Sequence, residues 1–134
     1  MNQKIVKSGK RKTSIAKAIL GGGNGKVTVN RKDYKTLDFF RRLKMEEPIR
    51  IAEKVLGKLN FDVEISVKGG GEKSQIEAAR LALARAINES AKNKELTDSF
   101  IAYDRNLLVA DVRRKEMYKP GDSKARRSRQ KSFR

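Results

Sequence analysis

The sequence predicts an α+β fold in which helices cover one face of a small β-sheet. Residues 61–68 alternate strictly between apolar and polar side chains, which is typical of a half-buried strand. Residues 73–91 carry apolar side chains at helical spacing. Glycine clusters at 21–25 and 69–71 mark turns between the periodic segments. A chain of 134 residues fits one domain of this kind.

The first two predicted strands cover residues 12–20 and 26–30. Between them, residues 21–25 read Gly-Gly-Gly-Asn-Gly and contain the Asn-Gly pair that tight hairpins favour. In the second strand Val27 and Val29 alternate with polar neighbours. We therefore expect the two strands to pair directly as a hairpin.

A short helical patch at 33–40 and a longer helix at 45–56 follow. We expect the aromatic side chains of the first patch, Tyr34, Phe39 and Phe40, to lie in the core. The second helix has glutamates and a proline near its start and a glycine after its end, which are ordinary boundary signals. Its apolar stripe consists of Met45, Ile49, Ala52 and Leu56.

The second half of the chain begins with the strand at 61–68 and continues into the longest helix, 73–91. A short helix at 96–102 and a strand at 107–112 complete the predicted domain. The apolar face of the 61–68 strand consists of Phe61, Val63, Ile65 and Val67. The stripe of the long helix consists of Ile76, Ala79, Leu83, Ala86 and Ile87.

These elements place a globular domain at 1–112 and an extended basic tail at 113–134. Pro120-Gly121 ends regular structure, and no hydrophobic periodicity follows it. Such a segment buries too little apolar area to fold alone, so we expect it to be mobile when free. From Pro120 onward it would reach roughly 50 Å when fully extended.

The charge is concentrated at the two ends of the chain. The formal net charge is +17. Residues 1–20 hold six basic and no acidic side chains, and residues 112–134 hold ten basic and two acidic ones, whereas residues 21–111 hold 17 and 14. Solubility rarely requires more than a net charge of about 2–8 in a small domain, so a polyanionic partner is favoured. Nucleic acid is preferred to an acidic membrane surface, because the tail has few large apolar side chains.

Composition excludes several other classes of protein. The chain has no His and no Cys, which removes histidine bases, thiolate chemistry, disulfides and cysteine-bound metals. We expect no metal and no cofactor. There is no run of about 18 apolar residues that could span a membrane. The N-terminus lacks the apolar core of a signal peptide, so the cytoplasm is the expected compartment.

The first candidate binding motif is Lys10, Arg11, Lys12 and Thr13. Three consecutive cations beside hydroxyl groups can hold phosphate, and an arginine can do so with two parallel hydrogen bonds. The alternative is an edge strand whose lysines prevent aggregation. The absence of acids in the first 20 residues favours RNA binding.

The second candidate is Lys68 followed by Gly69, Gly70 and Gly71 at the start of the long helix. Backbone N–H groups at a helix start attract phosphate, and glycines let it approach closely. The Gly-Lys-Ser/Thr ending of a Walker loop is missing. A simple turn capped by Ser74 is the slightly favoured alternative.

The triple glycine also raises the possibility of a nucleotide-binding enzyme. Such an enzyme would need carboxylates to hold a metal ion, and no spacing links the candidate acids. These candidates are Glu77, Asp104 and Asp111. Binding of nucleoside triphosphates with magnesium would distinguish this hypothesis. A chromatin-like DNA-binding protein is a second rival, which competition between duplex DNA and folded RNA would distinguish.

The third candidate is the tail, whose cations are dense enough to thread through a polyanion. A disordered tail or a localisation signal is the alternative. The candidate RNA-binding residues here are Arg113, Arg114, Lys115, Lys119, Lys124, Arg126, Arg127 and Arg129.

Five segments in this order resemble the universal small-subunit ribosomal protein nine family, in its archaeal and eukaryotic branch. They are GKRKTSIAKAIL (9–20), GGGNGKVTVN (21–30), VKGGGEKSQIEAARLALARAI (67–87), YDRNLLVADVRRKE (103–116) and ARRSRQKSFR (125–134). Together they extend over nearly the whole chain. One departure is Ser74, where the family often has glycine.

The resemblance implies a non-enzymatic ribosomal protein in the head of the small subunit. Its expected partners are small-subunit ribosomal RNA, neighbouring head proteins and the peptidyl-site tRNA. The implied fold is a two-layer sandwich of about four strands covered by helices, with the left-handed βαβ crossover of its superfamily. The residues implied to contact the tRNA are Lys131, Ser132, Phe133 and Arg134.

Overall fold

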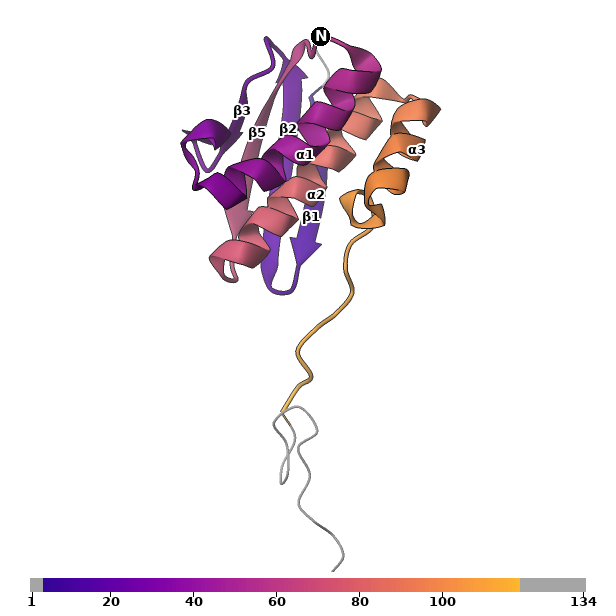
Figure 1. The fold of residues 1–134 in the computed structure, drawn as a ribbon. Helices are drawn as coiled ribbons and strands as arrows, with labels where there is room; N and C mark the ends of the chain where they lie inside the picture. The colour runs from indigo at the N-terminus through magenta and orange to yellow at the C-terminus, as the bar shows by residue number, and fades with distance from the viewer. Residues whose placement is uncertain (1–3, 119–134) are drawn as a thin grey trace, which may run out of the picture.

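The computed structural model describes residues 4–118 and is mixed α/β, as predicted (Figure 1). A five-stranded open sheet has the order β1-β2-β5-β3-β4, one strand more than the resemblance implied. Its elements are β1 (Ile5–Arg11), β2 (Ser14–Gly22), β3 (Val27–Val29), β4 (Lys32–Asp33), η1 (Tyr34–Thr36), α1 (Phe39–Leu56), β5 (Phe61–Lys68), α2 (Glu72–Ala91), α3 (Lys94–Tyr103) and η2 (Arg105–Leu107).

The expected hairpin between the first two predicted strands is wrong. β2 pairs with β1 on one side and with β5 on the other, both antiparallel. β3 pairs with β5 in parallel and with β4 antiparallel, so β5 separates β2 from β3. The glycine cluster does end β2, but a turn signal does not identify the partner of the strand that follows. The true hairpin is β1–β2, closed by the two residues Lys12 and Thr13.

The connection from β3 through α1 to β5 joins two parallel neighbouring strands. In Figure 1 the helices lie in front of the sheet, β3 and β5 run downward, and β5 lies to the right of β3. This arrangement is a left-handed crossover, the uncommon sense for a βαβ unit. It agrees with the crossover that the family resemblance implied.

The core lies between the sheet and the helices on one of its faces. All five members of the predicted α2 stripe are buried, and so are Val63, Ile65 and Val67 of β5. Buried alanines dominate α2, which lets its backbone lie close to β1 and β2. No helix covers the opposite face of the sheet in the described part of the chain, so β1, β2 and β5 present their alternate side chains to solvent.

Three local predictions differ from the structure. The helix predicted at 45–56 begins six residues earlier, at Phe39. The strand predicted at 107–112 is absent, because the chain forms η2 and then continues without regular structure up to residue 118. Phe39 and Phe40 are 59% and 79% exposed rather than buried, whereas Tyr34 packs against the core at partial exposure. The first turn of α1 directs both rings away from the buried stripe.

None of the helices among residues 4–118 is long and apolar enough to cross a membrane.

Candidate nucleic-acid interface

Three segments that are far apart in the sequence meet at one end of the body. They are the β1–β2 turn, the glycine loop after β5, and the chain that follows η2 (Figure 1). The Ser14 hydroxyl, beside the turn, donates to the carbonyl of Gly69 at 2.9 Å. Arg11, the last residue of β1, lies 3.6 Å from the carboxylate of Asp111. The fold thus brings parts of all three candidate motifs together.

The glycine loop is a tight turn fixed to the β1–β2 hairpin. Gly69 and Gly70 have φ of 78° and 66°, in the left-handed region that favours glycine. A Cβ on Gly70 would lie 2.0 Å from the Ser14 hydroxyl oxygen, so a side chain does not fit there. Gly71 has an ordinary φ of −93° and open space around it.

Ser74 closes this turn at the start of α2. Its hydroxyl oxygen accepts a hydrogen bond from the N–H of Gly71 at 3.2 Å and lies 2.8 Å from the hydroxyl of the buried Ser14. The interpretation as a capped turn is confirmed, and the serine at this departure from the family pattern holds the turn. Phosphate binding by the glycines stays a prediction.

The basic run on β1 divides between two faces. Successive strand residues point to opposite sides, so Lys10 faces the open side of the sheet and Arg11 faces the helices. Lys12 has a φ of 52° in the β1–β2 turn, and both Lys12 and Thr13 are exposed. The Arg11 side chain is 15% exposed. Adjacent cations therefore have different surroundings.

Three lysines form a cluster on the open face near this end. Ile15 of β2 lies between Lys10 of β1 and Lys68 of β5 in the sheet. Lys17 lies two residues further along β2, between Ser8 of β1 and Ser66 of β5. All three lysines are exposed. Within residues 4–118 none of them makes an ion pair. We call Lys10, Lys17 and Lys68 the open-face lysines.

Lys17 is not among the binding residues predicted from the sequence. The available signal was its alternation with Ala16 and Ala18, which are both fully buried. That alternation places Lys17 on the face opposite the core. The sequence does not predict that Lys17 lies near Lys68, because it pairs β2 with β3 rather than with β5.

The other end of the open face carries carboxylates as well as lysines, because Lys4 and Lys26 border the same hollow as Asp62 and Glu64. Asp62 and Glu64 of β5 lie on this face, beyond the open-face lysines. The Asp62 carboxylate accepts hydrogen bonds from the backbone N–H groups of Lys26 and Asn24 at 2.8 and 2.9 Å. These bonds, that of Lys26 first, hold the pKa of Asp62 below its usual range. Asp62 thus closes the loop between β2 and β3.

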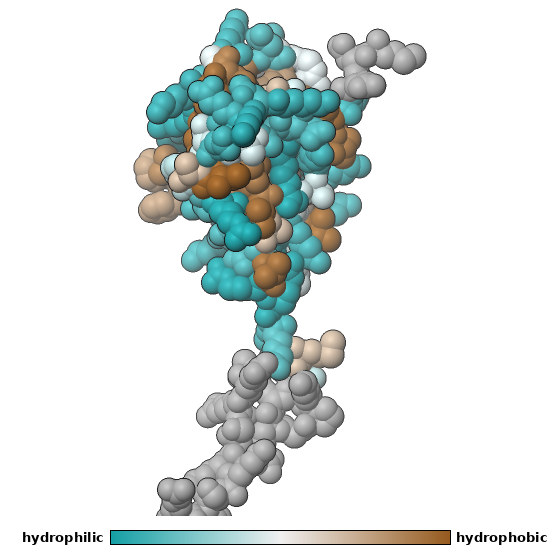
Figure 2. All heavy atoms as spheres, turned by 90° about the vertical axis from the view of Figure 1, so that its right-hand side faces the viewer, coloured by the Kyte–Doolittle hydropathy of each residue, from teal (hydrophilic) through white to brown (hydrophobic). Residues whose placement is uncertain are grey.

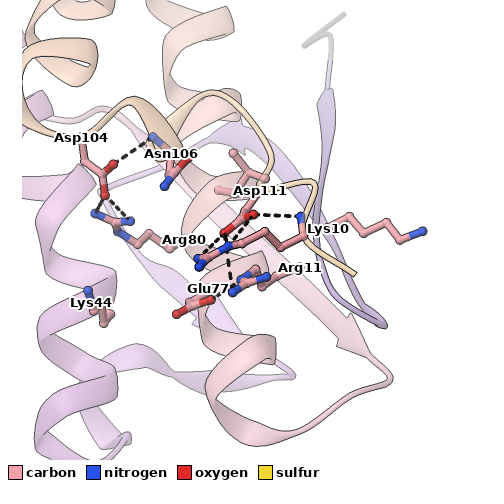
Figure 3. A pocket seen from close by; sticks show the side chains of 10 residues that line it. Lys10, Arg11, Lys44, Glu77, Arg80, Asp104, Asn106 and Asp111 are labelled. Carbon is pink, nitrogen blue, oxygen red and sulfur yellow. Dashed lines mark hydrogen bonds and ion pairs between the residues drawn. The ribbon is translucent and has the colours of Figure 1, made fainter. Parts of the chain in front are cut away.

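On the helix side, Arg11 belongs to a cluster of paired charges (Figure 3). Its Nε donates to Glu77 of α2 at 2.7 Å, and its Nη2 lies 3.6 Å from Asp111. Asp111 also accepts from the Arg113 guanidinium at 2.7 Å. The hydrogen bonds from the Arg113 side chain and backbone hold the pKa of Asp111 far below its usual range, and Arg11 adds to this effect.

Arg80 makes a second set of pairs in the same hollow. Its side chain is 9% exposed and contacts Glu47 of α1 at 2.5 Å and Asp104 at 3.1 Å. Arg80 and Asp104 line a hollow of about 150 Å³ together with Arg11, Asp111 and Arg113. Glu77, Asp104 and Asp111, the acids considered for an enzyme, are each paired with arginine. Residues 4–118 contain no group of three acidic side chains placed to hold a metal ion.

The chain after η2 is attached to the body by hydrogen bonds from Arg85. Its guanidinium donates to the carbonyls of Leu108 and Ser8, both at 2.9 Å. The segment that follows is exposed: the side chain of Arg113 is 78% accessible despite its bond to Asp111. Arg114 donates to the carbonyls of Asp111 and Arg113, and Lys115 lies over the ring of Tyr118.

The remaining predicted contacts lie outside the described residues. They are Lys119, Lys124, Arg126, Arg127, Arg129, Lys131, Ser132, Phe133 and Arg134. Within the described part, Figure 2 shows a mostly hydrophilic face with hydrophobic side chains interspersed.

Comparison with known proteins agrees with the sequence resemblance. The model of the family described as ribosomal protein S9/S16 matches residues 9–134. The chain is 44% identical over 129 residues to the small ribosomal subunit protein uS9 of Methanococcus vannielii, covering 94% of this chain and 95% of the relative. It is also 44% identical over 137 residues to the protein of the same name from Picrophilus torridus, covering all of both chains.

Proposed function

The chain belongs to the ribosomal protein S9/S16 family, and from this premise we propose that it is a structural constituent of the small ribosomal subunit that binds ribosomal RNA. Members of this family are ribosomal proteins and not enzymes. Both relatives named above are small ribosomal subunit proteins, and the chain matches nearly the full length of each. This supports the assignment to that subunit. In this proposal the protein lies in the subunit head beside other head proteins.

The observation that carries the RNA-binding proposal is the set of open-face lysines. Lys10 and Lys68 lie two strands apart, about 10 Å from backbone to backbone, with Lys17 between their strands. Because these lysines have no carboxylate partner among residues 4–118, each can neutralise a phosphate and release its counterions. Ser8 and Ser66, which flank Lys17, add hydroxyl donors to the same face.

The paired arginines have a different role in this proposal. Arg11 is already bound to Glu77, and Arg80 to Asp104 and Glu47. A phosphate would have to compete with these carboxylates for the same guanidinium groups. Arg11 therefore orients the end of β1 against α2 and Asp111, while Lys10 contacts the RNA.

The tail adds a second basic segment to the proposed interface. Residues 113–134 start on the helix side of the same end of the body, where Arg113 pairs with Asp111, and we propose that they form an arm that follows the RNA backbone. Ordering such an arm costs about 1–2 kcal/mol per residue in backbone entropy, which many phosphate contacts must offset. The density of ten basic residues among the last 23 suits that requirement.

The last four residues are the proposed contact with the peptidyl-site tRNA. We expect the guanidinium of Arg134 to face the tRNA backbone, because it offers a fork of hydrogen-bond donors to phosphate oxygens. Deletion of residues 131–134 should leave subunit assembly intact and weaken tRNA binding in purified subunits. A matched Gln130→Ala variant, next to the tip but outside the predicted contacts, should bind tRNA as the intact protein does. If the truncated particles hold tRNA as tightly as intact ones, the tip has no such role.

Co-sedimentation tests the assignment to the subunit directly. The full chain should sediment with small ribosomal subunits at moderate salt. It should also prefer folded ribosomal RNA to duplex DNA in a competition assay. Preference for the DNA would replace the ribosomal proposal with the chromatin-like one, and absence from the subunits would contradict it.

A further inference from the structure

The first turn of α1 carries two exposed aromatic side chains side by side. Phe39 is 59% exposed and Phe40 is 79% exposed, and their ring centroids are 5.5 Å apart in an edge-to-face arrangement. The guanidinium of Arg42 lies over the Phe39 ring at 5.8 Å, and the exposed Leu43 is nearby on the helix. An exposed group of large apolar side chains of this kind marks a contact surface.

The geometry of the helix explains why the core does not take up these rings. The buried face of α1 consists of Met45, Pro48, Ile49 and Ala52. Phe39 and Phe40 precede Met45 by six and five residues, which places them roughly 120–140° around the helix from it. Repacking one side chain cannot bring them inward, so they remain available to a partner outside the body.

The charge around the pair indicates the kind of partner. Residues 31–44 contain six basic and two acidic side chains, an excess of four, while the whole of 21–111 has an excess of three. Arg31, Lys32 and Lys35 are exposed, and their side chains make no ion pair within residues 4–118. Arg41, Arg42 and Lys44 pair with carboxylates, so Arg31, Lys32 and Lys35 supply the remaining positive charge beside the aromatic pair. A protein interface would more often be depleted of charge at its centre.

These cations lie close to the aromatic rings in space. Lys35 precedes Phe39 by four residues, a chain distance of at most about 14 Å. Lys32 and Arg41 line one hollow of about 190 Å³ between the sheet and the start of α1, so the basic β4 segment borders the first turn. Arg41 itself pairs with Asp38 and Glu72, which leaves Arg31, Lys32 and Lys35 as the cations of this segment without an ion pair among residues 4–118.

We infer that Phe39 and Phe40 form a stacking platform for unpaired RNA bases, flanked by Arg31, Lys32 and Lys35 as phosphate contacts. Bases in a duplex are stacked on each other, whereas bases in loops and bulges expose a face that aromatic rings can cover. Such stacking tolerates any base and is supported by neighbouring cations. This inference rests on the proposed RNA-binding function and assigns a second contact, separate from the open-face lysines and the tail.

The chain contains no tryptophan, so a single one reports on this site. In the full-length Phe40→Trp variant, a single-stranded oligouridine should quench the tryptophan emission by about twofold, because stacked bases quench the indole. A duplex RNA of equal length should cause little change. The matched control is Ile101→Trp on α3, at a position that is 49% exposed and lies away from the first turn of α1 (Figure 1). Neither RNA should change its emission.

Binding of labelled RNA, followed by fluorescence anisotropy, separates the possible outcomes. Phe39→Ala combined with Phe40→Ala should weaken binding of the single strand by roughly tenfold and binding of the duplex much less. If the RNA binds but quenches the Phe40→Trp and Ile101→Trp variants equally, the platform is wrong while the RNA-binding function stands. If no RNA binds the intact chain, both the stacking platform and the RNA-binding function are wrong. If the indole of Phe40→Trp is shielded from a soluble quencher in assembled subunits but is unaffected by RNA, a neighbouring protein covers the pair and the inference is overturned.

Discussion

Lys10 and Arg11 are adjacent on β1, yet they lie on surfaces with different chemistry. Lys10 faces the open side of the sheet with Lys17 and Lys68, where no carboxylate pairs with it among residues 4–118. Arg11 faces the helices and is held by Glu77 and Asp111. Consecutive cations on a strand therefore do not form one binding site. Successive side chains point to opposite faces, so some are available to a partner while others form ion pairs within the fold.

The largest effect is expected at another pair of neighbours, Gly70 and Gly71. Gly70→Ala should lower the free energy of unfolding by about 2–3 kcal/mol, because it combines a positive φ with overlap on the Ser14 hydroxyl. Gly71→Ala, with an ordinary φ and open space, should change it by less than about 0.5 kcal/mol. Urea denaturation of both variants measures this difference. Equal losses would mean that the loop is not fixed by the contact with Ser14.

A smaller loss of stability is expected from Arg11→Ala. It should cost about 1–2 kcal/mol, because Glu77 and the largely covered Asp111 lose a partner while Glu77 remains partly in water. Lys10→Ala should leave the free energy of unfolding within about 0.5 kcal/mol of the original. Thermal and urea unfolding of the two variants compare the two faces directly. A larger loss of unfolding free energy for Lys10→Ala than for Arg11→Ala would contradict the assignment of the two side chains to different faces.

These comparisons also show what the sequence could and could not predict. The strand 61–68 and the helix 73–91 were predicted to within one residue, because each displays its own period over many residues. The predicted strand pairing is wrong, since the insertion of β5 between β2 and β3 depends on contacts between residues 36 to 53 positions apart. The local alternation of Lys10 and Arg11 was available, but the carboxylates that pair with Arg11 come from residues 77 and 111.

The exposed phenylalanines follow the same rule. Aromatic residues are usually placed in the core, and Asp38, although a common residue before a helix, is not enough by itself to place the start of α1 at Phe39. Once that start is known, the helical period directs both rings outward. The Asp38 side chain makes no capping hydrogen bond, so tertiary contacts rather than a local cap determine where α1 begins.

The smallest effect is expected in the acid range. The pKa of Asp111 is lower in the folded chain than in the unfolded chain, so its pairing stabilises the fold above the ordinary aspartate pKa. That contribution is lost as the pH falls through the folded pKa. Asp111→Asn should therefore be less stable than the original chain near neutral pH, and the two should converge in strong acid. Urea midpoints measured from neutral pH down into strong acid test this, and a constant difference would contradict it.

The salt dependence of RNA binding tests the central claim most directly. The triple variant Lys10→Ala, Lys17→Ala and Lys68→Ala should bind a ribosomal RNA fragment more weakly and reduce the slope of log K against log salt by about 2–3, because each lysine neutralises one phosphate. Arg11→Ala should leave that slope unchanged while it lowers stability. A slope that changes with Arg11→Ala and not with the triple variant would place the RNA on the opposite face and contradict the account.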